Sequence, residues 1–121
     1  MTTVLAIDDS RTMRNLLRMS LEGAGFSFYD AVDGVEGVER YSDIKPDVVI
    51  TDINMPNLDG FGVIEQIRAG EVNNSVPILV LTTESGQSLK ERARDAGATG
   101  WIVKPFEDTS LVSVVKRVAG A

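Results

Sequence analysis

Five short apolar segments recur along the chain, each bounded by Gly, Pro, Asp or Asn. They lie at residues 4–7, 26–31, 48–51, 78–82 and 101–103 and are rich in β-branched or aromatic side chains, the composition typical of β-strands. The central segments, such as VVI and ILVL, are continuously apolar rather than alternating. Continuous apolarity is expected of strands covered on both faces, as in a parallel sheet. The pattern therefore predicts five parallel strands.

The segment after the first predicted strand has the spacing of an amphipathic helix. Its predicted inner face consists of Met13, Leu16, Leu17, Ser20, Leu21 and Ala24. Polar residues occupy the predicted outer face, namely Arg14, Asn15, Arg18 and Glu22. Because Gly is a common residue just beyond a helix end, we expect the helix to begin near Ser10 and to end before Gly25.

Four further segments complete the alternation of strands and helices. Residues 61–67 and 111–118 repeat the helical spacing of apolar side chains. Residues 34–41 and 87–96 fit it less well, because Gly37 interrupts the first and the second has few large apolar residues; we expect short or marginal helices there. Right-handed crossovers place such helices on both faces of an open sheet. The predicted fold class is α/β, a doubly wound (βα)5 arrangement with a five-stranded parallel sheet.

Residues with ionisable or hydroxyl side chains end or follow four of the five predicted strands. They are Asp8, Asp9, Asp52, Thr82, Thr83 and Lys104. The carboxyl ends of parallel strands share one edge of the sheet, where ligands bind, so these side chains should converge. Neighbouring carboxylates repel one another and favour a bound divalent cation, most naturally Mg²⁺. Three carboxylates, one Mg²⁺ and one lysine sum to zero charge, which suits the arrival of an anion.

Two simpler explanations of these residues stay open at the level of the sequence. Asp8 and Asp9 could only cap the helix that begins near Ser10, since Asp and Ser are common in that position. Lys104 could be a surface lysine. Convergence of all the strand ends on one site favours the functional interpretation over both.

The composition of the whole chain restricts the chemistry further. The 121 residues include no Cys and no His, which excludes disulfides, thiolate nucleophiles and imidazole bases or ligands. The 12 Lys+Arg and 18 Asp+Glu give a net charge of -6, which disfavours nucleic acid and anionic membranes as partners. There is no signal-peptide pattern, and no apolar run approaches the roughly 20 residues of a membrane span. We expect one domain over residues 1–121, without an output domain, in the cytoplasm.

Four segments carry a family resemblance that spans essentially the whole chain. AIDDS, PDVVITDINMPNLDG, PILVLTT and GWIVKPF, which begin at residues 6, 46, 77 and 100, resemble the receiver domain of two-component response regulators. Within that family the chain is similar to the single-domain chemotaxis regulators of the CheY type. The resemblance implies strand order 2-1-3-4-5, a flavodoxin-like three-layer sandwich, and a cis peptide bond between Lys104 and Pro105.

The resemblance also implies the central chemistry. Asp52 is the expected phosphoacceptor and takes a phosphoryl group from a phosphohistidine on a partner histidine kinase of the CheA kind. Carboxylates are competent phosphoryl nucleophiles when a cation neutralises the incoming oxygens. Mg²⁺, which Mn²⁺ could replace, is expected on Asp8 (through water), Asp9, Asp52 and the backbone carbonyl of Asn54. Lys104 is expected to pair with the phosphoryl group.

The remaining phosphoryl contacts and the switch follow from the same resemblance. The Thr82 hydroxyl and the backbone N–H groups of Ile53, Asn54 and Thr83 are expected to donate to phosphoryl oxygens. Movement of Thr82 would open space for an aromatic side chain on the fifth strand. Here that residue is Trp101, where the family usually has Tyr or Phe. The alternative is that Trp101 is a fixed, half-buried strand residue.

Asn54 separates two classes of function. Phosphatases that resemble haloacid dehalogenases carry a second Asp two residues after the nucleophile, whereas an amide cannot accept the proton of an attacking water. The sequence therefore favours a persistent phosphorylated switch, not a turnover enzyme, with slow self-hydrolysis tuned by Asn54 and Glu84. A Mg²⁺-dependent phosphohydrolase with Asp52 as nucleophile is the less favoured alternative.

The output is expected to be a surface of this monomeric domain, by resemblance the face of its fourth helix, fifth strand and fifth helix. A flagellar motor switch protein is the expected target in chemotaxis, with a phosphatase as a further partner. A phosphate sink or phosphorelay receiver would have the same site. Arg11, Arg14 and Arg18 form a basic stripe on the first helix, which is either a solvated face or a docking surface for an acidic kinase.

Overall fold

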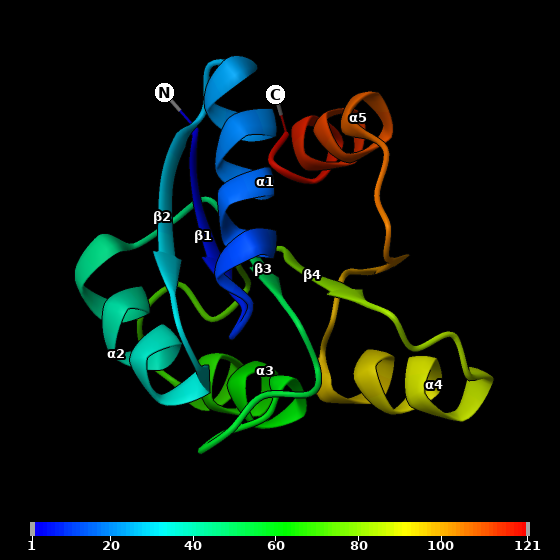
Figure 1. Ribbon diagram of the computed structural model, residues 1–121. Helices are drawn as coiled ribbons and strands as arrows, with labels where there is room; N and C mark the ends of the chain where they lie inside the picture. Colours follow the sequence, from blue (N-terminus) through cyan, green and yellow to red (C-terminus); the bar gives the residue numbers. More distant parts are fainter. Residues whose placement is uncertain (1, 121) are drawn as a thin grey trace.

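The computed structural model describes residues 2–120 and contains five strands alternating with five helices (Figure 1). The strands are β1 (Thr3–Ile7), β2 (Ser27–Ala31), β3 (Val48–Thr51), β4 (Ile78–Thr82) and β5 (Gly100–Val103). The helices are α1 (Arg11–Gly23), α2 (Gly34–Ile44), α3 (Gly60–Ala69), α4 (Gln87–Ala96) and α5 (Asp108–Val118). All five predicted strands and five predicted helices are confirmed, with ends that differ by a few residues. None of the described helices is long and apolar enough to cross a membrane.

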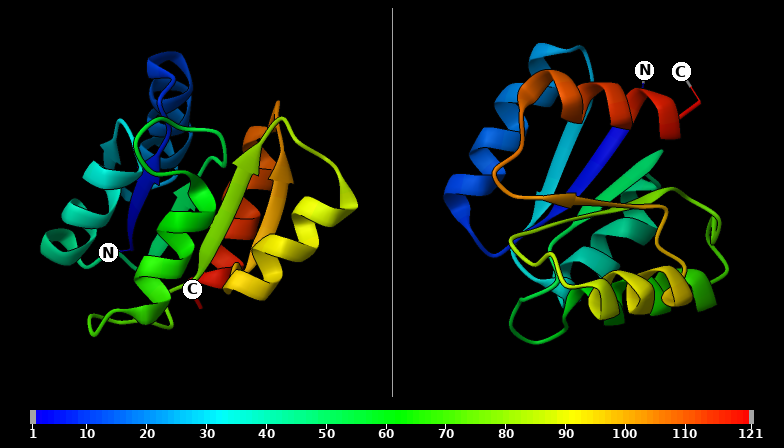
Figure 2. Two further views of the ribbon diagram at one scale, coloured as in Figure 1. Left: turned by 90° about the horizontal axis from the view of Figure 1, so that it is seen from below. Right: turned by 90° about the vertical axis from the view of Figure 1, so that its right-hand side faces the viewer.

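The strands form one parallel sheet in the order β2-β1-β3-β4-β5, which confirms the predicted doubly wound topology. Helices α1 and α5 cover one face and α2, α3 and α4 cover the other (Figures 1 and 2). Each face has its own apolar core, and the continuously apolar strands contribute alternate side chains to the two. Strands β3 and β4 are buried along their whole length, as the sequence pattern predicts.

The register of the strands aligns the ends of the central pair. Ile7 of β1 pairs with Thr51 of β3, and the N–H of Asp52 donates to the Ile7 carbonyl at 3.0 Å. Asp8, which follows β1, and Asp52, which follows β3, therefore lie side by side. At the ends of the neighbouring strands β4 and β5, the N–H of Lys104 donates to the Thr82 carbonyl at 2.8 Å. This bond fixes the backbone of the residue that follows β5.

Helix α1 buries only part of the face predicted for it. Leu17 and Leu21 are buried as expected, but Leu16 is 45 % exposed, and the Arg14 side chain is only 13 % exposed. The predicted inward positions of Leu16 and Ala24, which is also exposed, and the predicted outward position of Arg14 are therefore wrong. Arg14 is shielded because it forms an ion pair with Asp30 of β2, which holds its side chain against the sheet.

The two helices predicted as marginal are well formed. Helix α2 extends over 11 residues, and a Cβ on Gly37 would lie 2.5 Å from Cδ1 of Ile7. Gly37 thus weakens the local helix propensity but permits close packing of α2 on β1. Helix α4 has 10 residues and is stabilised by side chains rather than by a large apolar face: Arg92 stacks 3.9 Å from the ring centre of Phe61 on α3.

Candidate functional site

Three carboxylates meet at the carboxyl ends of β1 and β3. One oxygen from each of Asp8, Asp9 and Asp52 lies within 4.8 Å of the others. Asp8 is 2 % exposed and Asp52 9 % exposed, whereas Asp9 is exposed. The structure therefore brings together the three acidic residues that the sequence singles out, with one of them open to solvent.

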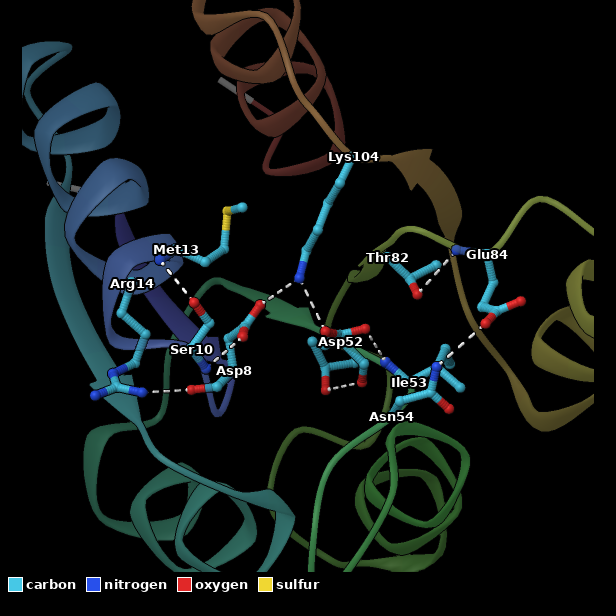
Figure 3. A network of polar contacts seen from close by, with 11 residues as sticks. Asp8, Ser10, Met13, Arg14, Asp52, Ile53, Asn54, Thr82, Glu84 and Lys104 are labelled. Carbon is cyan, nitrogen blue, oxygen red and sulfur yellow. Dashed lines mark hydrogen bonds and ion pairs between the residues drawn. The ribbon is translucent and has the colours of Figure 1, made fainter.

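Lys104 joins two of these carboxylates. Its Nζ lies 2.9 Å from Oδ2 of Asp8 and 2.9 Å from Oδ2 of Asp52, and its side chain is 11 % exposed (Figure 3). Burial disfavours the ammonium and is the largest single influence on the pKa of Lys104, but the hydrogen bonds to Asp52 and Asp8 and the negative charges of both carboxylates together outweigh it and raise that pKa. Lys104 is therefore a charged donor here and not a surface lysine. The peptide bond before Pro105 is cis, as predicted.

Every polar group of Asp8 has a protein partner. The Asp8 N–H donates to the Ala31 carbonyl at 3.1 Å, and its carbonyl accepts from Arg14 Nη1 at 2.7 Å. Its Oδ1 accepts from the Ser10 N–H at 2.8 Å and its Oδ2 from Lys104. Burial is the main cause that raises the pKa of the Asp8 carboxyl, and these bonds offset it only in part.

Asp52 presents its carboxylate differently. Its Oδ1 accepts a 2.6 Å hydrogen bond from the N–H of Ile53, while its Oδ2 accepts from Lys104. The Ile53 N–H, predicted to donate to a phosphoryl oxygen, is thus directed at the Asp52 carboxylate in this state. A positively charged donor therefore holds one oxygen of this carboxylate, and a backbone donor holds the other.

Glu84 links the other residues that the sequence predicts at this site. Its side chain accepts from Asn54 Nδ2 at 3.4 Å, and its backbone N–H donates to the Thr82 hydroxyl at 3.3 Å (Figure 3). Its backbone carbonyl accepts from the indole Nε1 of Trp101 at 3.0 Å. Trp101 is half-buried and packs on the core beneath α3 and α4. Thr82 and Trp101 are therefore both hydrogen-bonded to Glu84.

Two predicted contributions concern the backbone. Thr83 is exposed directly after β4, and Asn54 is exposed two residues after Asp52. Their predicted N–H contacts to a phosphoryl group and the predicted metal contact of the Asn54 carbonyl stay predictions.

The side chain of Ser10 accepts from the N–H of Met13 at 3.2 Å and caps α1. The first helix therefore begins where the sequence indicates.

Arg14 and Asp30 are contacts of the site that the sequence pattern did not reveal. Arg14 bonds to Asp30 through Nε at 3.2 Å, and Arg18 also lies 3.5 Å from Asp30. Arg18 further contacts Glu22 and the ring of Phe28. A charged residue inside the second predicted strand was the available signal. Two members of the basic stripe on α1 are thus paired within the protein, and the third, Arg11, is exposed.

The donor set suits a hard divalent cation. Mg²⁺ prefers oxygen ligands, keeps several waters and needs only one or two carboxylates from the protein. Asp9 and Asp52 provide these oxygens at an open edge, and Asp8 is close enough to act through water. Lys104 lies on the opposite side of Asp52 from Ile53 (Figure 3). The residues present therefore fit Mg²⁺.

Comparison with known proteins agrees with this site. Residues 4–116 match the family model of the response regulator receiver domain. The response regulator MprA of Mycobacterium leprae is 39 % identical over 115 residues, which are 95 % of this chain and 50 % of that protein. A sensor histidine kinase CheAY of Helicobacter pylori is 34 % identical over 116 residues, 94 % of this chain and 14 % of the kinase.

A solved structure shares the whole architecture. The chemotaxis protein CheY4 of Vibrio cholerae superposes with a TM-score of 0.93 at 38 % identity, and the match covers 98 % of both chains. The chain spans about half the length of the Mycobacterium regulators that it matches. The family match, the strand order and the acidic cluster beside Lys104 lead to one conclusion: the chain belongs to the receiver domains of two-component response regulators.

Proposed function

We propose that this chain is a phosphorylation-activated switch whose phosphoacceptor is Asp52. The observation that carries the proposal is the position of Lys104, whose Nζ lies 2.9 Å from carboxylate oxygens of both Asp8 and Asp52. A receiver domain takes its phosphoryl group from a histidine kinase, and no histidine exists in this chain. The donor imidazole therefore belongs to a partner.

The chemical step is an in-line transfer between two protein side chains. A carboxylate oxygen of Asp52 forms a bond to phosphorus as the P–N bond to the partner's imidazole breaks, and the electron pair of that bond stays on the leaving nitrogen. Lys104 neutralises charge on the transferred group. Thr82 and the backbone N–H groups of Ile53, Asn54 and Thr83 donate to its oxygens. Asp52 is 9 % exposed, so only a small part of this residue is accessible to a partner.

Mg²⁺ would be held by Asp9, Asp52 and the Asn54 carbonyl, with Asp8 through water, and would supply charge neutralisation of the phosphoryl oxygens. The chain's own residues set the rest of the chemistry. Asn54 has an amide and no carboxylate at the position where a phosphatase would need a base. This favours a slowly hydrolysed aspartyl phosphate, with Asn54 and Glu84 beside the approach of water.

The output surface in this proposal is the face of α4, β5 and α5. Helix α4 and β5 border a surface pocket of about 200 Å³ that is lined by Lys90, Arg94 and Trp101, among others. Trp101 connects this pocket to Glu84 and thereby to Thr82. The two basic side chains suit an acidic target. Residues 1–121 would act as one receiver domain whose phosphorylation changes this surface.

Chemotaxis is the process we propose for this switch, with a motor switch protein as target. The support is the match over 98 % of both chains to a chemotaxis protein and the similarity to a segment of a kinase named CheAY. A phosphate sink or phosphorelay receiver uses the same chemistry. A pull-down with phosphorylated and unphosphorylated protein against a purified motor switch protein distinguishes these roles, because only a motor regulator gains affinity on phosphorylation.

The test of the phosphoacceptor uses Asp52→Asn and wild type with a ³²P-labelled histidine kinase and Mg²⁺. We expect stoichiometric label on the wild type alone, stable in acid and labile in base as acyl phosphates are. Label on the Asn variant would refute Asp52 as acceptor. Many turnovers of a small phosphate ester by the wild type would favour the phosphohydrolase alternative instead.

A further inference from the structure

The Arg14 guanidinium forms a bridge between the acidic site and strand β2. Its Nη1 donates to the backbone carbonyl of Asp8 at 2.7 Å, and its Nε donates to Oδ2 of Asp30 at 3.2 Å. The side chain is 13 % exposed, so these charged hydrogen bonds are partly shielded from water. Bonds of this kind are stronger than those between neutral groups.

The carbonyl that Arg14 holds belongs to the peptide bond between Asp8 and Asp9. Because a peptide unit is planar, a fixed carbonyl also fixes the direction of the Asp9 N–H and the place of the Asp9 Cα, from which the side chain starts. The Asp9 side chain is exposed, and within residues 2–120 no hydrogen bond or ion pair of that side chain is found. Its direction therefore depends on its backbone.

We infer that Arg14, anchored by Asp30, is a positioning residue for the cation site: it fixes the Asp8–Asp9 peptide so that the Asp9 carboxylate faces those of Asp8 and Asp52. The inference rests on the proposed Mg²⁺ binding of this site. It assigns Arg14 to the interior of the domain rather than to a kinase-docking stripe.

If Arg14 acted only through its positive charge, its removal would change the Mg²⁺ affinity in the opposite direction. A guanidinium close to the carboxylates repels an incoming cation, so its removal would tighten Mg²⁺ binding if Arg14 acted only through its charge. Asp30 pairs with that charge at 3.2 Å and reduces the repulsion. Loss of groups that orient metal ligands typically weakens metal binding by about 10-fold to 100-fold. The two explanations therefore differ in the sign of the change.

The experiment measures Mg²⁺ affinity of the unphosphorylated protein by isothermal titration calorimetry, with Mn²⁺ binding followed by electron paramagnetic resonance as an independent readout. The variants are Arg14→Met and Asp30→Asn. Arg18→Met is the matched control, because Arg18 lies on the same helix and 3.5 Å from Asp30 but its contacts do not include Asp8. Urea denaturation in EDTA measures the stability of each protein separately.

We expect Arg14→Met to weaken Mg²⁺ binding by about 10-fold, Asp30→Asn to weaken it in the same direction, and Arg18→Met to change it by less than about 2-fold. Unchanged or tighter binding by Arg14→Met would overturn the inference while leaving the proposed function intact. A folded wild type that binds no Mg²⁺ would count against both. If Arg14→Met does not fold, Arg14→Lys provides the same comparison, since it retains the charge but lacks the planar fork.

Discussion

The indole Nε1 of Trp101 donates a 3.0 Å hydrogen bond to the backbone carbonyl of Glu84, the residue whose N–H bonds to the hydroxyl of Thr82. The aromatic residue on β5 and the hydroxyl at the end of β4 are thus linked through one peptide segment. We expect a movement of Thr82 toward a phosphoryl group to disturb the bond to the Glu84 N–H, and through Glu84 the acceptor of Trp101.

Trp101 should therefore report phosphorylation by its fluorescence. We expect the emission of this sole Trp to change when Mg²⁺ and acetyl phosphate are added to the wild type, and to stay constant in Asp52→Asn. Trp101→Phe, which leaves the Glu84 carbonyl without its donor, should lose about 1 kcal/mol of the free energy of unfolding. An unchanged emission spectrum, with phosphorylation verified by mass spectrometry, would mean that Trp101 is a fixed strand residue.

Lys104→Met should destabilise the protein in EDTA and make its stability depend more strongly on Mg²⁺. Lys104 compensates two carboxylates that are nearly buried, and removal of one partner of a buried ion pair typically costs about 3–5 kcal/mol. Added Mg²⁺ should recover more stability in this variant than in the wild type, as urea denaturation with and without the ion would measure. Lys116→Met, at an exposed position of α5, is the control and should behave as wild type in both conditions.

Asp8 should make the metal-free protein less stable as the pH rises. Burial raises the pKa of its carboxyl in the folded state above the 3.8 of an unperturbed Asp. At pH values between 3.8 and this raised pKa, the folded state therefore holds the proton more tightly than the unfolded state. In that range the free energy of unfolding falls with increasing pH. Asp8→Asn has no such proton, and its stability relative to wild type should increase from pH 3.8 upward and level off above the raised pKa.

The measurement for Asp8 is urea denaturation of wild type and Asp8→Asn at a series of pH values in EDTA. Comparing the two proteins at each pH cancels the titration of the other acidic groups. A difference in stability that is independent of pH would contradict the raised pKa. Added Mg²⁺ should reverse the ranking, because a cation that binds the folded wild type stabilises it by mass action.

Gly60→Ala should disturb the phosphoacceptor through its backbone. A Cβ at position 60 would lie 2.2 Å from the carbonyl oxygen of Asp52 and 2.9 Å from Cα of Ile53, so one of these groups must shift. We expect a loss of about 1–3 kcal/mol in the free energy of unfolding and slower phosphorylation by acetyl phosphate.

Gly23→Ala is the matched control for that substitution. Gly23 is also helical, but a Cβ there has no neighbour within 4 Å. This change should raise stability by about 0.5–1 kcal/mol, since Ala loses less conformational entropy in a helix than Gly. Equal effects of the two substitutions in calorimetric melting would argue against the close approach of Gly60 to Asp52.

The fold could be predicted from the sequence because its signals are local. Continuous apolar strands and the 3.6-residue spacing identify the elements, and parallel strands necessarily bring Asp8 and Asp52 to one edge. The face of α1 could not be predicted in the same way. Periodicity treats an arginine as a solvated side chain, whereas Arg14 is shielded by its pairing with Asp30 on another element.

The same limit applies to the contacts of the site. The sequence indicates Asp8, Asp52 and Lys104 but not that the Ile53 N–H and Lys104 share the Asp52 carboxylate between them. Nor does it indicate that Gly37, a poor helix former, is needed for the approach of α2 to Ile7. These features depend on distances between elements that become defined only when the core is packed.

Asp8 has partners that come from both edges of the sheet. Its N–H bonds to Ala31 at the end of β2, one edge strand, and its carboxylate bonds to Lys104 directly after β5, the other edge strand. A single residue near the middle of the sheet thus ties its two outermost strands to one another across four strand spacings. A change that breaks the hydrogen bonds of Asp8, such as a substitution, should therefore affect β2 and β5 at the same time. We expect the rates of amide hydrogen exchange in these two strands to change together.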